Sequence, residues 1–160
     1  MTKTVYMLVG VPASGKSTWT CCLMDDYVNE SVFLYSTDEY IQGAADAEGK
    51  TYNDVFQSTI KEATACMNES LAEATFAGMD IFWDQTNLSA KARMGKLSKI
   101  PKDYRKVAVV FPIPEAEELQ RRLDSRPGKT IPSHVMESMI GNYVPPTRDE
   151  GFDEIIEIKE

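Results

Sequence analysis

A glycine-rich loop near the N-terminus constrains the fold of this chain more than any other feature. Residues 10–18 read GVPASGKST, which matches the pattern G-x-x-x-x-G-K-[ST]. The loop follows the short apolar run TVYMLVG at residues 4–10, which predicts a buried strand, and a helix is expected over residues 16–27. A strand, a glycine loop and a helix in this order present backbone N–H groups to phosphate oxygens.

Two side chains of the loop carry further chemistry. Lys16 can reach the outer phosphates of a bound nucleotide, and the Ser17 hydroxyl is placed for Mg²⁺. We therefore predict a nucleotide site. Its residues are Gly10, Ala13, Ser14, Gly15, Lys16, Ser17 and Thr18.

The rest of the chain alternates between strand and helix patterns. Further strands are predicted at residues 31–36, 79–84, 106–113 and 152–158. Further helices are predicted at residues 38–46, 51–77, 89–99, 115–124 and 133–142. Apolar strands separated by helices indicate an α/β fold, a parallel sheet covered on both faces. Ligands of such sheets bind beyond the carboxyl ends of the strands.

Two aspartates follow strands of this predicted sheet. Asp84 ends the third strand and could hold the Mg²⁺ shell, or it could be a helix cap or turn residue. Asp38 lies just past the second strand, where a carboxylate could accept the proton of an attacking hydroxyl. The alternative for Asp38 is a helix N-cap, a position that aspartate favours.

A second group of charges lies near a Gly/Pro loop at residues 125–132. Arg122 and Arg126 are four residues apart at its start, and Arg121 is adjacent. An arginine on a mobile loop can stabilise the charge that spreads over a transferring phosphoryl group. Pro127 and Gly128 suit a lid that hinges, so we expect an arginine-bearing lid here, with a solvated helix end as the alternative.

Composition limits the possible class of protein. The chain has 160 residues, 42% of them hydrophobic, and no apolar run long enough to cross a bilayer, so we expect one domain over residues 1–160 and no membrane. The N-terminus does not resemble a signal peptide. Three cysteines, without metal-like spacing, are expected to be small core residues of a cytoplasmic protein. The lone histidine, His134, is expected at a helix start on the surface.

The net charge of -8 argues against broad, non-specific binding of nucleic acid, which depends on lysine and arginine. Basic residues nonetheless cluster between residues 91 and 106, where we expect a solvated helix face.

Taken in order, the motifs GVPASGKST, STDEY, DQTNL, RRLDSRPGKTIP and EGFDEI resemble the kinase domain of phage-type polynucleotide 5′-hydroxyl kinases, within the P-loop kinase superfamily. The resemblance implies a sheet of about five strands in the order 2-3-1-4-5, with a short lid. It implies ATP and Mg²⁺ as cofactors, Lys16 and Arg126 as catalytic residues, and Asp38 as the general base. Arg122 would lie beside the nucleotide, and a phage origin would place the protein in the host cytoplasm.

The resemblance also implies an acceptor cleft. Its residues would be Thr86, Asn87, Ile131, Pro132 and Val135, with Val135 packing on a nucleobase. Kinases of this kind grip the acceptor's phosphate with arginines beside the base. Thr37 and Ile41 stand at those positions here, and neither can neutralise a phosphate.

The sequence therefore predicts an ATP-dependent kinase that phosphorylates a hydroxyl. The leading acceptor is the 5′-hydroxyl of a single-stranded polynucleotide. A nucleoside, a nucleotide or a related metabolite is the alternative acceptor, and a hydroxymethylated base in DNA is a narrower one. A nucleotide-switched binding module is the non-enzymatic alternative.

Overall fold

The computed structural model describes residues 2–25, 27 and 31–159. The strands are β1 (Thr4–Val9), β2 (Val32–Tyr35), β3 (Asp80–Trp83), β4 (Arg105–Val110) and β5 (Glu154–Glu157). The helices are α1 (Lys16–Met24), α2 (Thr37–Glu48), α3 (Tyr52–Phe76), α4 (Ala90–Leu97), α5 (Ala116–Asp124), α6 (Ser133–Gly141) and the 3₁₀ turn η1 (Arg148–Glu150).

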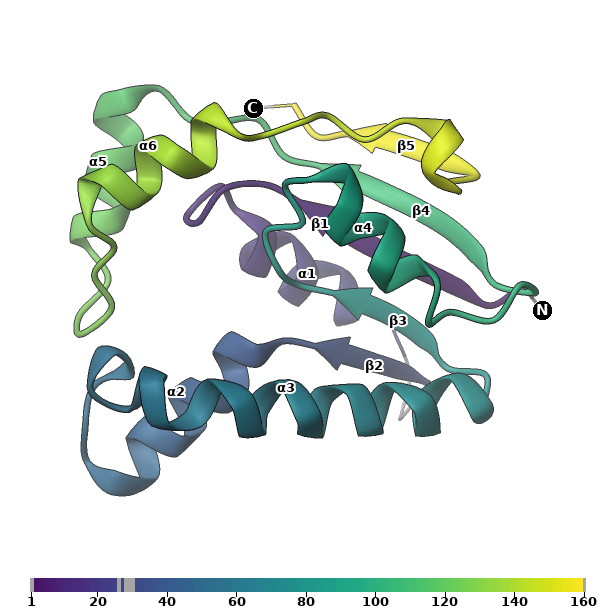
Figure 1. The fold of residues 1–160 in the computed structure, drawn as a ribbon, viewed down its shortest axis with the longest axis horizontal. Coiled ribbons are helices and arrows are strands. Elements are labelled where there is room, and N and C mark those ends of the chain that lie inside the picture. The colour runs from purple at the N-terminus through teal and green to yellow at the C-terminus, as the bar shows by residue number, and fades with distance from the viewer. Residues whose placement is uncertain (1, 26, 28–30, 160) are drawn as a thin grey trace.

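The strands form one five-stranded parallel sheet in the order β2-β3-β1-β4-β5 (Figure 1). This confirms the predicted fold class and strand order. The central strand β1 pairs with β3 on one side, with Val5 opposite Ile81, and with β4 on the other. Because all strands run in the same direction, their carboxyl ends share one edge of the sheet.

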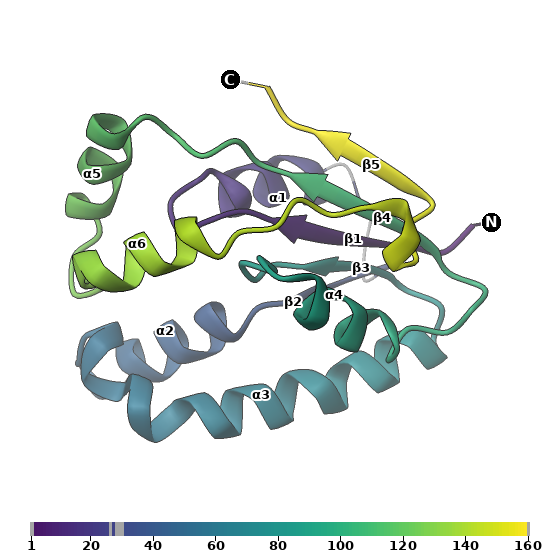
Figure 2. The ribbon, with the colours of Figure 1, turned by 45° about the horizontal axis from the view of Figure 1, so that its top comes forward.

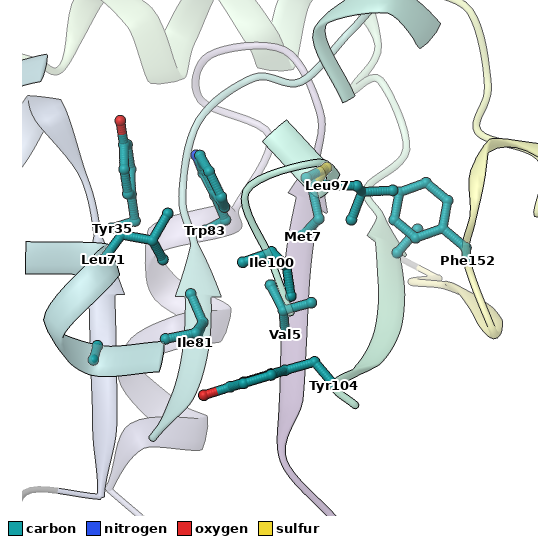
Figure 3. Close-up of a cluster of buried hydrophobic side chains, with 12 residues drawn as sticks. Val5, Met7, Tyr35, Leu71, Ile81, Trp83, Leu97, Ile100, Tyr104 and Phe152 are labelled. Carbon is teal, nitrogen blue, oxygen red and sulfur yellow. The ribbon is translucent and has the colours of Figure 1, made fainter. Parts of the chain in front are cut away.

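Helices cover both faces of the sheet (Figures 1 and 2). Val5 and Met7 of β1 face α3 and α4, where they join a buried cluster that includes Trp83. Figure 3 shows this cluster, with the rings of Tyr35 and Trp83 side by side at a centroid distance of 4.3 Å. Alternate residues of β1 point to the opposite face and pack against Trp19 of α1.

Two smaller clusters place the outer helices. Ile41 and Val55 join α2 to α3 near the β2 end of the sheet. Val11, Leu119 and Met136 join α5 and α6 to the loop after β1. The segment between α5 and α6 therefore lies beyond the carboxyl ends of the strands (Figure 1).

Two predicted boundaries were wrong by about three residues. Helix α1 ends at Met24, and Tyr27 lies in a bend with its ring against Phe82 and its hydroxyl donating to Asp80. Strand β4 ends at Val110, because Pro112 has no N–H to extend the ladder. Within the described residues, no helix is both long and apolar enough to cross a membrane.

Two expectations about side chains were also wrong. Cys21 and Cys22 are exposed on α1 rather than buried in the core. Arg93, expected on a solvated helix face, is fully buried. Its guanidinium donates to both carboxylate oxygens of Glu150, at 2.6 and 3.0 Å, and to the backbone oxygen of Asn87 at 2.9 Å. This ion pair fastens α4 to η1, two elements that are far apart in the sequence.

The buried ion pair predicts a stability effect. Glu150→Gln should lower the free energy of unfolding by about 3 kcal/mol, because it leaves the Arg93 charge buried without a counter-charge. Urea unfolding followed by circular dichroism measures this loss.

Glu154→Gln is the matched control. Glu154 pairs with Arg105, but its side chain is 39% exposed, so the loss should be about 0.5 kcal/mol. Equal losses for both variants would contradict the assigned role of the buried pair.

Candidate active site

The loop between β1 and α1 has the backbone that a phosphate cradle needs. Gly15 has a φ of 103° at the start of α1, a conformation that favours glycine. At Gly10, an added Cβ would lie 2.6 Å from Ser14 Oγ and 3.1 Å from Phe111 Cβ, so a side chain here would force the loop to shift. Lys16 is 8% exposed, and its ammonium donates to the backbone oxygens of Gly10 and Val11, each at 2.9 Å. The loop backbone therefore has the shape that a phosphate site needs, and the Lys16 ammonium is held at its opening.

Two buried polar atoms in the described part of the chain have no hydrogen-bond partner. They are Ser14 Oγ in the loop and Arg126 Nη1 in the lid. Both residues line the same cleft. Because buried polar groups are nearly always paired, an anionic ligand with several acceptor oxygens fits this place.

Ser17 and Asp84 meet as the sequence predicted for a metal site. The Ser17 hydroxyl donates to Asp84 Oδ2 at 3.1 Å. Burial raises the pKa of the Asp84 carboxyl, against the opposing effects of Lys16 and the Ser17 hydrogen bond. One hydroxyl and one carboxylate beside a phosphate site fit Mg²⁺, which usually keeps several waters and takes phosphate oxygens as further ligands.

Asp38 is not the N-cap of α2. That role belongs to Ser36, whose Oγ accepts from the backbone N–H of Glu39 at 3.2 Å. Asp38 instead faces the cleft and accepts from the Tyr52 hydroxyl at 2.6 Å and from the Lys129 ammonium at 2.9 Å. Desolvation would raise the pKa of Asp38, but Lys129 and the Tyr52 hydrogen bond hold it below the usual range. The carboxylate is therefore ionised and oriented at neutral pH.

The lid segment, residues 125–132, docks on the start of α3. The backbone N–H of Asn53 donates to the oxygen of Gly128 at 3.0 Å, and its side-chain amide donates to Thr130 Oγ1 at 2.7 Å. The Lys129 ammonium lies 4.4 Å from the centroid of the Tyr52 ring. Figure 1 shows this segment reaching from α5 and α6 toward α2. These contacts hold Arg126 and Lys129 over the cleft.

The three arginines near the lid have different surroundings. Arg126 lines the cleft, and its charge acts on both Lys16 and Asp38. Arg122 donates to the oxygen of Ala13 at 3.1 Å and to Glu118 at 2.9 Å, so it braces the phosphate loop. The Arg121 side chain is 69% exposed and also pairs with Glu118.

The cleft between these elements has a volume of about 980 Å³. Eight of the residues predicted to bind the nucleotide or the metal line this cleft. They are Ala13, Ser14, Gly15, Lys16, Ser17, Thr18, Asp84 and Arg122. Asp38 and Arg126 lie in the same wall.

The expected acceptor residues do not all lie together. Thr86 lines the cleft, and it also lines a second hollow of about 460 Å³ with Asn87 and Val135. Asn87 is 2% exposed, with a φ of 51°, and its amide donates to the backbone oxygen of Leu8 at 2.7 Å. Ile131 packs against the Val11 cluster, and Pro132 is exposed at the start of α6.

Sequence reasoning missed two residues of the site. Tyr52 sits in a helix that was identified only by its apolar periodicity, and nothing local marks it as a partner of Asp38. Lys129 lies in the segment expected to form the lid, but nothing in the sequence indicates that it pairs with Asp38. Thr37 and Ile41 are buried, at 6% and 0% exposure, so neither reaches an acceptor.

A five-stranded parallel sheet of this order, with a phosphate loop after its central strand, defines the class of P-loop kinase folds. The sequence model of a family described as an AAA domain matches residues 5–146, and the chain belongs to that family.

Known proteins resemble the chain at low sequence identity. It is 24% identical over 160 residues to heterogeneous nuclear ribonucleoprotein U-like protein 2 of Mus musculus, covering 94% of this chain and 21% of that protein. The chain therefore spans about a fifth of the length of the curated relatives it matches.

Among solved structures, the Pnkp1/Rnl/Hen1 RNA repair complex contains a chain with a TM-score of 0.68 and 21% identity, covering 88% of this chain and 44% of that one. A fungal RNA kinase has a TM-score of 0.58 and 16% identity, covering 99% and 75%. A gluconokinase from Sinorhizobium meliloti 1021 has a TM-score of 0.56 and 18% identity, covering 97% and 81%. At these identities the similarity establishes the fold alone.

Because the lid packs closely on α3, one methyl group added at Gly128 should displace it. Gly128 has a φ of 70°, and an added Cβ would lie 2.6 Å from Thr51 Cβ, so Gly128→Ala should push the lid off α3. Amide hydrogen exchange across residues 125–132 should rise by about tenfold, which corresponds to a loss of about 1.4 kcal/mol.

Gly43→Ala is the control, because Gly43 lies inside α2 with no atom within 4 Å of an added Cβ. It should leave exchange in the lid unchanged. Similar exchange in both variants would mean that the lid does not depend on this close approach.

Proposed function

We propose that residues 1–160 act as one kinase domain that transfers the γ-phosphoryl group of ATP to a hydroxyl, with the 5′-hydroxyl of a polynucleotide as the leading acceptor. One observation carries the proposal. A phosphate loop, a hydroxyl–carboxylate pair, an ionised aspartate and an arginine with a buried, unpaired N–H group all line one cleft. Phosphoryl transfer needs these groups together, because its catalysis is mostly positioning and stabilisation of charge.

Each residue has a defined part in the transfer. The acceptor oxygen bonds to the γ-phosphorus as the bond from that phosphorus to the β–γ bridging oxygen breaks, and ADP leaves. Asp38 takes the hydroxyl proton. Lys16 and the loop N–H groups hold the phosphates, while Arg126 stabilises the equatorial oxygens. Ser17 and Asp84 would hold Mg²⁺, which would neutralise part of the phosphate charge.

The position of Asp38 matters more than its basicity. The pKa of Asp38 is low, so it is a weak base at neutral pH. In a loose transition state the hydroxyl loses its proton late, and a weak but well-oriented carboxylate is sufficient. Tyr52 supplies that orientation through a hydrogen bond of 2.6 Å.

Two acceptor classes are favoured by different observations. The motif resemblance, together with solved neighbours that include a fungal RNA kinase and a chain of an RNA repair complex, supports a polynucleotide. The burial of Thr37 and Ile41 and the net charge of -8 support a small molecule, because neither of these positions carries an arginine that could grip a nucleic-acid phosphate. A gluconokinase with the same fold is consistent with this second class.

Transfer of labelled γ-phosphate from ATP tests the proposal. The acceptors are a 5′-hydroxyl oligonucleotide, a panel of nucleosides and nucleotides, and gluconate. Lys16→Met serves as the inactive reference. Label on the oligonucleotide would support the leading acceptor, and label only on small molecules would support the second. Consumption of ATP with no labelled acceptor would contradict a kinase.

The proposed base predicts a selective loss. Asp38→Asn keeps the shape of the side chain and its place beside Tyr52, but it cannot take a proton. Transfer should fall by about 10²- to 10⁴-fold, while the Kd for ATP changes by less than about twofold. Asp46→Asn, an exposed change on the same helix, is the control. Equal loss of ATP binding and transfer would assign Asp38 a structural role.

Substitution of Arg126, the arginine of the lid, should change kcat far more than the KM for ATP. Arg126→Ala should lower kcat by about 10³-fold or more, because an arginine of this kind acts on charge that develops in the transition state. The KM for ATP should change much less. Arg121→Ala, at an exposed position of α5, should change neither constant. An effect of Arg126→Ala on KM alone would reduce this residue to a binding role.

A further inference from the structure

A second hollow opens beside the cleft and has no part in the transfer described above. Its volume is about 460 Å³, and its wall comes from the segment after β3, from α4 and from α6. Thr86 lines both the cleft and this hollow, so the two spaces adjoin. Val135 gives the hollow an apolar surface, while Lys96, His134 and Asn142 give it polar ones.

Lys96 is the cation of this hollow, and its charge has little compensation. Its ammonium donates to Asn87 Oδ1 at 2.5 Å and lies 5.8 Å from the centroid of the Trp83 ring. Between residues 2 and 159, leaving out 26 and 28–30, no carboxylate forms an ion pair with it. An ammonium has three N–H donors, so further acceptors can be accommodated.

The electrostatics of Lys96 agree with this geometry. Burial, and to a lesser degree the charge of Lys99, lower the pKa of Lys96 to about 8. A partly buried ammonium without a counter-ion costs folding free energy, so such groups are usually paired.

Arg93, another cation of α4, shows how a buried charge is neutralised within this chain. Arg93 lies one turn before Lys96 and is fully buried. Its Nε and Nη2 both donate to the carboxylate of Glu150. Lys96 has no such carboxylate and instead lines a hollow. The contrast indicates that the counter-charge of Lys96 comes from a ligand.

The position of the hollow indicates which molecule carries the anion that would bind Lys96. It adjoins the cleft through Thr86, next to Asp84, rather than through the phosphate loop. The two positions beside Asp38, Thr37 and Ile41, are buried and uncharged, so they cannot hold an anion of the acceptor. Lys96 is the cation of the hollow that adjoins the cleft at Thr86.

We infer that the second hollow is an anion subsite for the acceptor, in which Lys96 binds a phosphate or carboxylate group carried by the molecule whose hydroxyl is phosphorylated. Asn142 and His134 border the same space and can donate to the anion, and Val135 contacts the uncharged part of the molecule. This inference rests on the proposed kinase function, which it deepens by requiring an anionic acceptor.

Lys96→Met tests the subsite, because methionine keeps an unbranched stem over Trp83 and removes the ammonium, with its charge and its hydrogen bond to Asn87 Oδ1. Lys99→Met is the matched control, since Lys99 is exposed three residues further along. The acceptors are a nucleoside 3′-monophosphate, the corresponding nucleoside and gluconate. For the anionic acceptors, the KM should rise by about 10- to 100-fold in Lys96→Met, as expected for a lost charge-assisted hydrogen bond. The KM for ATP and for the neutral nucleoside should stay unchanged.

Titration of the nucleoside 3′-monophosphate into each protein by calorimetry gives a readout that does not need turnover. Its affinity should fall in Lys96→Met and not in Lys99→Met. The Tm of Lys96→Met should fall by only a few degrees, because loss of the hydrogen bond to the buried Asn87 Oδ1 is offset in part by removal of an uncompensated charge.

The outcomes separate the two proposals. If no acceptor is labelled, the kinase function fails, and the titration still decides the subsite. Wild-type protein that phosphorylates only neutral acceptors would overturn the subsite and keep the kinase. A much lower Tm with equal losses for charged and neutral acceptors would make Lys96 structural, and so would overturn the inference.

Discussion

Parallel pairing of β1 with β3 and β4 is the constraint on which the rest of the structure depends. It brings the phosphate loop and the segment after β3 to one edge, where two hydrogen bonds join them. Gly10 N–H donates to Thr86 O at 3.0 Å, and the Asn87 amide donates to Leu8 O at 2.7 Å. Asp84 then meets Ser17 without any further adjustment of the chain. The Ser17–Asp84 pair therefore follows from the parallel register of the strands.

The cleft contains more positive charge near the phosphate loop than its carboxylates neutralise. Lys16, Arg126 and Lys129 act on one another and on Asp38. Burial and these neighbouring cations lower the pKa of Lys16 to about 8, although Asp84 and Asp38 oppose the shift. A triphosphate would supply the missing negative charge and the acceptors for Ser14 and Arg126. Contacts between the lid and α3, and between Lys129 and Asp38, hold the lid cations over the cleft.

Local signals in the sequence were sufficient for some site residues and ambiguous for others. The phosphate loop could be assigned because its glycines, lysine and serine have fixed spacing and one physical reason for it. The stretch STDEY was ambiguous, because serine, threonine and aspartate are all good N-caps. In the structure Ser36, with an extended backbone, is the cap, and Asp38 in the first turn of α2 faces the cleft.

The sequence by itself determined the phosphate loop, the alternation of strands and helices, and, through its motif order, the strand order 2-3-1-4-5. The loop and the alternation depend on backbone conformation and on periodicity, which act over a few residues, whereas the strand order was implied by the family resemblance. Only the tertiary structure decided that Tyr52 and Lys129 share Asp38, that Arg93 is buried against Glu150, and that Lys96 lines a hollow. A lysine or arginine on a helix looks the same in sequence whether it meets water or a neighbouring element. Its partner is chosen by the packing of segments that are distant in the chain.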